Sequence, residues 1–511
     1  MLREAARSHS DKIALVQGDH RWTYAELDLK VDRLARGLLA DGLEPGDRVI
    51  VQLPNVPEFV MVFFALLRAG AHPVLAQPTY RSNEITHIYR LADPVTYVVS
   101  DIVRGFDHRL LAAQVLREVD GMRRAYVIGA PGELDPLPAA PGEAGPLPDV
   151  DGADVSCLLL SSGTTAMPKM IPRTHDQFTY RLRMMQEICG FSEESVYLAA
   201  LPVGHDFTLS NVMTTLSTGG TVVLAADPSP QECFQLIERE GVTITSVVPT
   251  IAATWLEAKE WAREDLSSLS LIQVGGSSLP QRLAKRVEPS FDCRLQQVFG
   301  MSEGLINFTR LTDPPEVVMT CQGRPLSPAD EIKVVDDTGA EIAPGQVGEL
   351  LARGPGVIRG YYRAAEQNAA AFTQDGFYRT GDLVRLTESG NIVVQGRRKD
   401  VINRAGEKIS PAEVENHLLD HPAVRQAAVV GIPDSDLGEY VCAYLVSGGP
   451  APTLPELREL FKAKGVAAYK VPHRVEIVDG LPLTAMGKVD KKALVAKGMA
   501  TATNPEEAHE H

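Results

Sequence analysis

Residues 161–169 read SSGTTAMPK, and the elements on either side of this stretch indicate the fold class. An apolar run, Val155–Leu160, comes directly before it and predicts a buried strand. Gly163 allows a turn in which successive backbone N–H groups point at one anion. This composition is typical of a phosphate-binding loop, although an ordinary surface turn can share it. The side chains that we expect to contact phosphate are Ser161, Ser162, Thr164, Thr165 and Lys169.

Strands and helices alternate along the chain on both sides of this loop. Before it, Thr23 and Glu26 form a capping box that opens a helix, and Val49–Leu53 predicts a strand. A second alternating series begins with the strand that feeds the loop. Such alternation predicts an α/β fold with mostly parallel sheets flanked by helices. The strands predicted in the second series are residues 155–160, 196–201, 221–224, 244–248, 271–274 and 295–298.

Two of these predicted strands end in turns that contain glycine. QVGGSS occupies residues 273–278, and QVFGMSEG occupies residues 297–304. Open α/β sheets bind their ligands beyond the carboxyl ends of the strands. We therefore expect both turns to belong to the ligand site.

The sequence divides into two predicted domains. A large N-terminal domain covers residues 1–396 and includes a β-rich subdomain at residues 330–396, where short strands and turns replace the alternation. Residues 397–400 form a basic joint, and residues 401–500 form a small α+β domain with enough chain for its own core. The tail, residues 501–511, is expected to be disordered.

Composition excludes several classes of protein. The 66 acidic residues exceed the 50 Lys and Arg residues and give a net charge of −16, which argues against nucleic acid as a partner. The longest apolar run, Phe59–Leu67, is too short to cross a membrane, and the first residues do not resemble a signal peptide. Six scattered cysteines show no metal-ligand spacing. We expect a cytoplasmic protein with reduced thiols and no membrane association.

Five motifs occur in order along the chain and carry a resemblance to a known family. They are SSGTTAMPK, FGMSEG (299–304), GFYRTGD (376–382), GRRKDVINRAGEKISPAEVEN (396–416) and LPLTAMGKVDKK (481–492). With them the chain resembles the adenylate-forming superfamily of acyl- and aryl-CoA synthetases, nonribosomal-peptide adenylation domains and luciferases. It looks most like the stand-alone aryl acid–AMP ligases that activate 2,3-dihydroxybenzoate or salicylate.

The resemblance implies an enzyme with two half-reactions. A carboxylate and ATP give an acyl-AMP and pyrophosphate, and the acyl group then passes to a thiol. Lys488 is expected to bridge the substrate carboxylate and the α-phosphate, because two anions must meet there. Glu303 corresponds to the family's magnesium-associated glutamate, and Lys399 to its hinge residue, about which the small domain swings.

The resemblance also assigns residues to the nucleotide. Asp382 and Arg397 are expected to bind the ribose, and the family's adenine slot maps to the glycine turns after the two strands. The loop has Ala166 and Met170 where the family usually has glycine. We therefore expect Lys169 to have only a supporting role in phosphate binding. The remaining nucleotide residues are Gly275, Gly276, Phe299, Gly300 and Ser302.

The acid pocket is expected around LPVGHDFTLSN, residues 201–211. His205 resembles a pocket residue of the family, but Asp206 stands where activators of dihydroxybenzoate and salicylate typically have asparagine. A buried carboxylate is unfavourable unless it accepts a hydrogen bond from a donor. This favours an aromatic acid with an amino group at ring position 2, of the anthranilate or 3-hydroxyanthranilate type. Salicylate and 2,3-dihydroxybenzoate are the alternatives. The other pocket residues are Phe207, Asn211 and Ser277.

The sequence leaves too few residues after Lys488 for a carrier domain, so the thiol must come from outside. The resemblance favours the phosphopantetheine thiol of a separate aryl carrier protein, as in nonribosomal peptide synthesis, with coenzyme A as the alternative. A luciferase-like oxygenase and a non-catalytic scaffold share the fold, but the reactive set argues for a ligase. The oligomeric state stays open and includes a homodimer.

Overall fold

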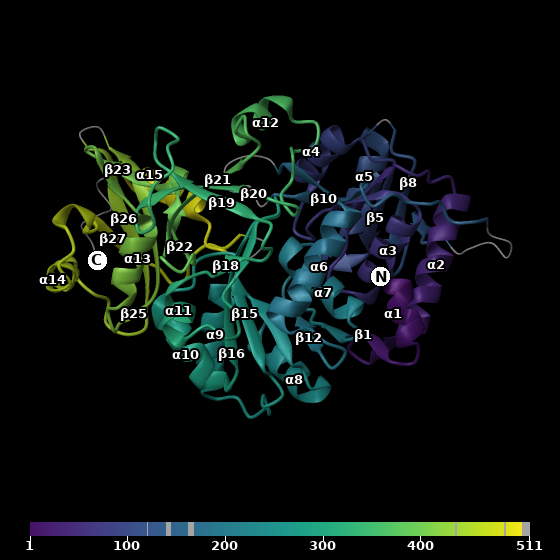
Figure 1. Ribbon diagram of the computed structural model, residues 1–511, viewed down its shortest axis with the longest axis horizontal. Coiled ribbons are helices and arrows are strands. Elements are labelled where there is room, and N and C mark those ends of the chain that lie inside the picture. The colour runs from purple at the N-terminus through teal and green to yellow at the C-terminus, as the bar shows by residue number, and fades with distance from the viewer. Residues whose placement is uncertain (120, 139–144, 162–167, 435–436, 485–486, 503–511) are drawn as a thin grey trace.

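The protein is described by a computed structural model, shown in Figure 1. The amino-terminal part of the chain lies at the right of that view and the carboxy-terminal part at the left, with a smaller sheet between them. The structure describes residues 1–119, 121–138, 145–161, 168–434, 437–484 and 487–502.

The first large sheet has seven strands, and neighbours are parallel except at the β10–β11 edge. Its strands are, in order, β11 (Met170–Thr174), β10 (Val155–Leu160), β4 (His72–Leu75), β3 (Arg48–Gln52), β5 (Thr96–Ser100), β8 (Arg124–Ile128) and β9 (Asp135–Pro136).

The second large sheet has nine strands, parallel in the middle and antiparallel at both edges. Its strands are, in order, β18 (Arg324–Pro325), β17 (Ile306–Phe308), β16 (Arg294–Gly300), β15 (Leu271–Gly275), β14 (Ile244–Val247), β12 (Val196–Ala199), β13 (Thr221–Leu224), β1 (Ile13–Gln17) and β2 (His20–Thr23). The predicted α/β class is confirmed.

One detail of the predicted topology is wrong. The strand that feeds the phosphate loop, β10, pairs with β4 and so belongs to the first sheet, although it was expected to open the second series. In return, β1 from the amino-terminal end pairs with β13 in the second sheet. Local hydrophobic pattern indicates that a segment is a strand, but pairing between distant strands depends on the packing of the whole domain.

Helices fill the space between the two sheets and cover their outer faces. Alternate residues of a strand point to opposite faces, so Val49 and Val51 join the core between the sheets and Ile50 joins an outer core. The inner helices are α1 (Leu2–Ser8), α2 (Tyr24–Ala40), α3 (Pro57–Arg68), α6 (His175–Cys189) and α7 (Asp206–Ser217). The outer helices are α4 (Ser82–Ala92), α5 (His108–Glu118), α8 (Pro230–Glu240), α9 (Pro249–Lys259), α10 (Gln281–Phe291) and α11 (Pro315–Thr320).

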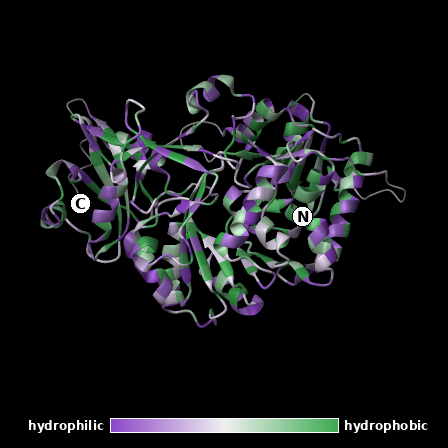
Figure 2. Cartoon of the chain, viewed as in Figure 1, coloured by the Kyte–Doolittle hydropathy of each residue, from purple (hydrophilic) through white to green (hydrophobic). Residues whose placement is uncertain are grey.

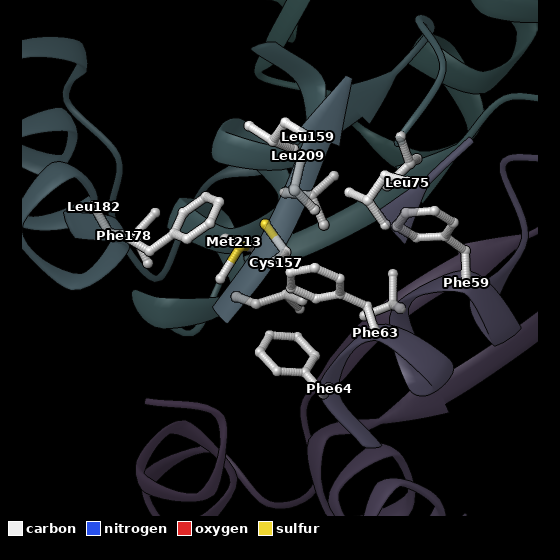
Figure 3. Packing of buried hydrophobic residues seen from close by; sticks show 14 of the residues in the cluster. Phe59, Phe63, Phe64, Leu75, Cys157, Leu159, Phe178, Leu182, Leu209 and Met213 are labelled. Carbon is white, nitrogen blue, oxygen red and sulfur yellow. The ribbon is translucent and has the colours of Figure 1, made fainter. Parts of the chain in front are cut away.

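The inner core holds α7 in place. Figure 3 shows Phe63 of α3 and Met213 of α7 next to Cys157 of β10, with Leu209 of α7 beside Leu159 and Phe59 of α3 beside Leu75. Figure 2 shows the same partition over the chain, with hydrophobic residues concentrated on the strands and polar residues on the outer helix surfaces. No helix within the described ranges is both long and apolar enough to span a bilayer.

Two smaller sheets complete the described fold. An antiparallel sheet, with α12 (Ala365–Ala371) beside it, contains β19 (Glu331–Val335), β20 (Val347–Arg353), β21 (Tyr378–Leu386) and β22 (Ile392–Arg397). The carboxy-terminal sheet contains β24 (Glu407–Ile409), β23 (Ile402–Arg404), β26 (Gly438–Ser447), β25 (Val424–Asp434) and β27 (Arg474–Ile477). Its helices are α13 (Pro411–Leu419), α14 (Leu454–Ala463) and α15 (Lys491–Ala502).

Three short elements and the tail remain. A hairpin of β6 (Ile102–Val103) and β7 (Phe106–Asp107) precedes α5, and two short 3-10 turns cover Arg398–Asp400 and Ala468–Lys470. The predicted disordered tail began at residue 501, but α15 continues to Ala502. Residues 503–511 lie outside the described part of the chain.

Candidate active site

Lys488 lies where the carboxy-terminal segment meets the second large sheet. Its Cε atom is 3.2 Å from the position that a Cβ on Gly276 would occupy. The Thr250 hydroxyl of α9 donates a 2.6 Å hydrogen bond to the carbonyl of Gly487 and so holds the neighbouring residue. Burial, together with the positive charge of Arg397, lowers the pKa of Lys488 to about 8. A desolvated amine therefore stands beside the glycine turn that follows β15.

This glycine turn leaves no space for side chains. Gly276 has a φ of +88°, a conformation that favours glycine. A Cβ on Gly275 would lie 2.9 Å from the Val298 carbonyl oxygen and 3.4 Å from the Phe207 ring. The predicted adenine residues and the predicted acid residue Phe207 thus meet here, whereas Ser277 is exposed.

Asp382 and Arg397 form the charged part of the site. They are register partners on β21 and β22, and Arg397 Nε is 3.0 Å from Asp382 Oδ1. Asp382 is 3% exposed, and burial raises the pKa of its carboxyl against the opposing effect of Arg397. Its second oxygen, Oδ2, is buried and has no hydrogen-bond partner among the described residues. This oxygen is an acceptor that suits a hydroxyl donor from a ligand.

The base of the predicted phosphate loop is closed by two hydrogen bonds. Ser161 N donates to the Lys169 carbonyl at 2.9 Å, and Lys169 N donates to Ser161 Oγ at 3.0 Å. The Lys169 ammonium lies 4.5 Å from the centroid of the Tyr361 ring. Ser161 therefore holds the loop closed. The expectations for Ser162, Gly163, Thr164 and Thr165 lie outside the described residues.

Glu303 is held beside the same tyrosine. The Tyr361 hydroxyl donates a 2.8 Å hydrogen bond to Glu303 Oε1 and lies 2.9 Å from the hydroxyl of Tyr378. The Ile358 amide donates to the Glu303 carbonyl at 2.8 Å. Lys169 and Glu303, which are 134 positions apart by number, are thus brought to one tyrosine.

The other predicted nucleotide residues lie at the end of β16 and in the turn that leads to Glu303. Phe299 and Gly300 end β16, where the Phe299 carbonyl accepts a 2.9 Å hydrogen bond from Asn307 Nδ2. Ser302 follows in the turn and is partly buried. The structure therefore places all three directly before Glu303.

The amino-terminal end of α7 carries the predicted acid residues. His205 caps this helix, and its Nδ1 accepts from the Phe207 amide at 3.4 Å. Burial and then the charge of Lys488 lower the pKa of His205 to about 4, so the ring is neutral at neutral pH. His205 and Lys488 are therefore neighbours at the acid side of the site.

Asp206 has a hydrogen-bond donor within the protein. Arg181 of α6 lies 2.7 Å from Asp206 Oδ1 and also donates to Ser210 at 3.1 Å. Both members of the ion pair are buried, with exposed fractions of 2% for Arg181 and 6% for Asp206. The premise that Asp206 needs a donor from the substrate is wrong, because the protein supplies the donor. The hypothesis that the substrate is a 2-aminobenzoate therefore loses its physical basis.

Sequence reasoning missed Arg181, although a signal for it exists. Arg181 lies on the face of α6 that also carries buried Phe178, Leu182 and Met185. A charged side chain at an apolar position of a helix is rare unless it has a buried partner. The pattern could have indicated a buried carboxylate, but it could not have indicated which one.

Asn211 lies one turn further along α7 and is fully buried. Its Nδ2 donates a 2.9 Å hydrogen bond to Gln273 Oε1, whereas its Oδ1 has no partner among the described residues. Asn211 and Phe207 are four positions apart and so lie on one face of the helix. The acid side of the site therefore contains an unpaired acceptor.

The family of the chain follows from this arrangement and from comparison with known proteins. Residues 2–362 match the AMP-binding enzyme family, and residues 413–488 match the C-terminal domain of AMP-binding enzymes. The chain belongs to the AMP-binding enzyme family. In this AMP-binding enzyme the glycine turns lie in the first matched segment, Lys488 lies in the second, and Asp382 and Arg397 lie between the two.

Relatives of this AMP-binding enzyme include named acid–AMP ligases. The 2,3-dihydroxybenzoate-AMP ligase of Bacillus subtilis is 50% identical over 496 residues, which cover 97% of this chain and 92% of that protein. The salicyl-AMP ligase / salicyl-S-ArCP synthetase of Mycobacterium tuberculosis is 44% identical and covers 99% of this chain and 91% of its own length. The predicted resemblance to aryl acid–AMP ligases is confirmed, and the enzyme is an acid–AMP ligase.

Solved structures agree with the fold. The apo structure of MbtA from Mycobacterium smegmatis is 44% identical, with a TM-score of 0.74 over 97% of this chain and 94% of that one. ATP-bound MatB from Rhodopseudomonas palustris is 26% identical, with a TM-score of 0.87 over 97% of this chain and 98% of that one. The more distant relative superposes better, so the difference does not follow sequence similarity.

In this AMP-binding enzyme the basic joint forms a 3-10 turn, Arg398–Asp400, directly after β22. Burial, and then the charge of Arg397, lower the pKa of Lys399 within it. Arg398 lies 2.9 Å from Glu349 and 3.0 Å from Asp337, so ion pairs to the neighbouring sheet hold the joint.

A further arginine connects α10 to the carboxy-terminal unit. Arg282 donates hydrogen bonds to the carbonyls of Leu419 at 2.8 Å and Val424 at 3.0 Å, at the end of α13 and the start of β25. Together with the contact of Thr250 to Gly487, these bonds hold the carboxy-terminal unit where Lys488 reaches the site. The sequence motifs gave no indication of Arg282.

Proposed function

We propose that this enzyme uses ATP to adenylate a 2-hydroxylated aromatic carboxylic acid, with release of pyrophosphate, and transfers the aroyl group to the phosphopantetheine thiol of a separate carrier protein, with release of AMP. The observation that carries the proposal is the position of Lys488. Its amine stands beside the glycine turn and is close enough to interact electrostatically with Asp382 and Arg397 and with His205. One cation is thus shared by a nucleotide end and an acid end.

The chemistry follows from charge. The carboxylate oxygen must approach the α-phosphorus of ATP, and both groups are negative. In a site from which water is largely excluded, a protonated Lys488 lowers this repulsion more than it would in water. The neutral ring of His205 adds no competing charge beside it.

The nucleotide end fits ATP. Asp382 Oδ2 is a buried acceptor without a protein partner, and a ribose hydroxyl supplies the missing donor. Arg397 already neutralises the carboxylate through Oδ1. We propose the two residues as the ribose site and the turn at Gly275 and Gly276 as the adenine site, where a side chain would block close approach.

Glu303 fits a magnesium ion that arrives with the nucleotide. No group of three or more metal-ligating side chains occurs among the described residues, so a protein-only metal cage is not formed there. A single carboxylate together with phosphate oxygens is a usual arrangement for Mg²⁺, which would offset phosphate charge. Tyr361 holds the carboxylate of Glu303 in place.

The choice of acid rests on Asp206 and on the relatives. The buried pair with Arg181 gives Asp206 its donor within the protein, so the reason for an amino substituent is removed. Two relatives that cover most of this chain are named for 2,3-dihydroxybenzoate and salicylate. We therefore propose a hydroxybenzoate of one of these two types as the substrate.

The acceptor and the hinge belong to the same proposal. A relative named salicyl-S-ArCP synthetase supports a carrier protein as acceptor, with coenzyme A as the second candidate. We propose that Lys399 is the pivot that removes Lys488 from the site before transfer. Lys399→Pro should then spare pyrophosphate exchange and block thioester formation. Normal transfer by this variant would exclude the pivot.

The test is ATP–pyrophosphate exchange with salicylate, 2,3-dihydroxybenzoate, anthranilate and 3-hydroxyanthranilate, followed by loading of a carrier protein or coenzyme A. We expect faster exchange with salicylate and 2,3-dihydroxybenzoate than with the two aminobenzoates. We also expect faster loading of the carrier protein than of coenzyme A. A preference for anthranilate or 3-hydroxyanthranilate would restore the hypothesis of a 2-aminobenzoate substrate. A lack of exchange with every aromatic acid would refute the proposal.

A further inference from the structure

Three buried amides form a chain that ends at Asn211. Asn211 Nδ2 donates to Gln273 Oε1 at 2.9 Å, and Gln273 Nε2 donates to Gln296 Oε1 at 2.9 Å. Gln296 Nε2 in turn donates to the backbone carbonyl of Thr309 at 2.9 Å and to that of Ile188 at 3.3 Å. The three amide side chains are all fully buried, so water does not complete their hydrogen bonds.

The far end of this chain fixes the orientation of every amide in it. Backbone carbonyls only accept hydrogen bonds, so the NH₂ group of Gln296 must face Thr309 and its oxygen must face Gln273. The same reasoning turns the NH₂ group of Gln273 toward Gln296 and its oxygen toward Asn211. Asn211 therefore donates from its NH₂ group to Gln273, and its oxygen remains available as an acceptor.

That oxygen has no donor within the described protein. Asn211 Oδ1 is buried and unpartnered. The hydroxyl of Tyr197 also interacts with the Asn211 amide, and this contact favours the phenol oxygen as the acceptor, so it does not supply a donor to Oδ1; the same hydroxyl is hydrogen-bonded to Ser246 Oγ. A buried acceptor without a donor is unfavourable, so we expect it to have a ligand as its partner.

The position of the oxygen relates it to the acid. Asn211 lies one helical turn beyond Phe207 on the same face of α7, and its partner Gln273 lies two residues before Gly275. Phe207 and Gly275 already border the site near Lys488. Asn211 thus lies at the end of the acid side that is further from the amine.

We propose that Gln273 and Gln296 are positioning residues that hold Asn211 Oδ1 as an acceptor for a hydroxyl group on the aromatic ring. The enzyme would then select acids with a donor at that ring position over acids of the same size without one. This inference rests on the proposed aryl acid adenylation, and it adds the reason for its selectivity.

The chain offers a matched control on the same strand. Gln297 follows Gln296 on β16 and points to the opposite face, where its Nε2 donates to the Val318 carbonyl at 2.6 Å. Gln297 Oε1 accepts from Gln322 at 3.1 Å, and Gln322 Oε1 accepts from the Val394 amide at 2.8 Å. This second amide chain is also buried, and its hydrogen bonds run to α11 and β22 and not to α7.

The experiment compares each hydroxyl acid with its fluorine analogue, which is similar in size and donates no hydrogen bond. The pairs are salicylate with 2-fluorobenzoate, and 2,3-dihydroxybenzoate with 3-fluorosalicylate. In at least one pair we expect kcat/KM of the wild-type enzyme for exchange to favour the hydroxyl by about tenfold or more. Gln296→Leu should reduce this ratio to about threefold or less, because the Asn211 amide can then rotate and no longer presents its oxygen to the ring. KM for ATP should stay unchanged. Gln297→Leu should retain the ratio.

Two outcomes would overturn the inference. One is a wild-type ratio near one in both pairs, which needs no variant to measure. The other is an equal loss of the ratio in Gln297→Leu and Gln296→Leu, which would indicate a general effect of destabilised packing. Gln273→Met serves as the second relay variant if Gln296→Leu does not fold. Absence of exchange with every acid would instead refute the proposed function, so the two failures are distinct.

Discussion

Two buried aspartates occupy opposite ends of the site, and each is paired with an arginine. Asp382 lies 3.0 Å from Arg397, and Asp206 lies 2.7 Å from Arg181. Arg397 is half exposed and leaves Asp382 Oδ2 without a partner, whereas Arg181 is buried with Asp206 inside the helical layer. An Asp–Arg pair therefore leaves an acceptor open in one place, where we propose that it binds the ribose, and is packed within the fold in the other. The difference lies in the surroundings, which the residue type alone does not indicate.

The largest effect is expected at Lys488, which lies between the two ends. Lys488→Ala should reduce ATP–pyrophosphate exchange by about a hundredfold or more, because it removes the amine that offsets the repulsion between the two anions. Transfer from a supplied acyl-adenylate should be retained, since it does not require the two anions to meet. Lys492→Ala, which removes an exposed lysine of the same segment, is the control. Equal loss of both half-reactions would contradict the assignment.

Asp382→Asn should sharpen the comparison at the nucleotide end. Loss of a charged acceptor for the ribose is expected to lower kcat/KM for ATP by about tenfold to a hundredfold. The melting temperature should change little, because the site retains solvent access through Arg397. An unchanged kcat/KM for ATP would remove Asp382 from the ribose site.

Arg181→Met should show the opposite pattern at the acid end. It leaves the Asp206 charge buried without its partner and should lower the free energy of unfolding by about 3 kcal/mol or more. The double variant Arg181→Met with Asp206→Leu should recover much of that stability. Denaturant unfolding measures both changes. A single variant as stable as the wild-type protein would show that the pair contributes nothing to the fold.

The pH dependence tests the charge of Lys488. Its pKa is lowered to about 8, first by burial and then by Arg397, with Asp382 acting in the opposite direction. The amine is needed in its charged form, so kcat/KM for the acid should fall as the pH rises through about 8. Lys488→Arg stays charged and should lose this alkaline decline, even if its rate is lower. The same decline in both proteins would assign it to another group.

The smallest effect is expected at the contact between α10 and the carboxy-terminal unit. Arg282→Ala removes two hydrogen bonds that hold Lys488 in reach, and exchange should fall about threefold to tenfold. Arg286→Ala, one turn further on α10 and paired with Glu260, is the matched control. Equal rates for the two variants would show that Arg282 does not stabilise this arrangement.

The proposed nucleotide residues follow more directly from the sequence than the proposed acid residues do, and the reason is physical. Asp382 and Lys488 lie in short contiguous motifs whose chemistry depends on local residues. Asp206 was misread because its partner lies 25 positions earlier on another helix, and Gln273 and Gln296 act on Asn211 through pairings between distant elements. The same limit applies to the fold, where strands were predicted correctly but the sheet to which β10 belongs was not.

The most direct test of the central claim is a crystal structure with a stable analogue of salicyl-adenylate. We expect Lys488 Nζ to contact both the acyl group and the phosphate-equivalent group. A ribose hydroxyl should donate to Asp382 Oδ2, and the aromatic ring should lie between Phe207 and Lys488. A complex in which Lys488 contacts neither group, while the carboxy-terminal unit keeps the position described, would contradict the claim that this one amine joins the two ends of the site.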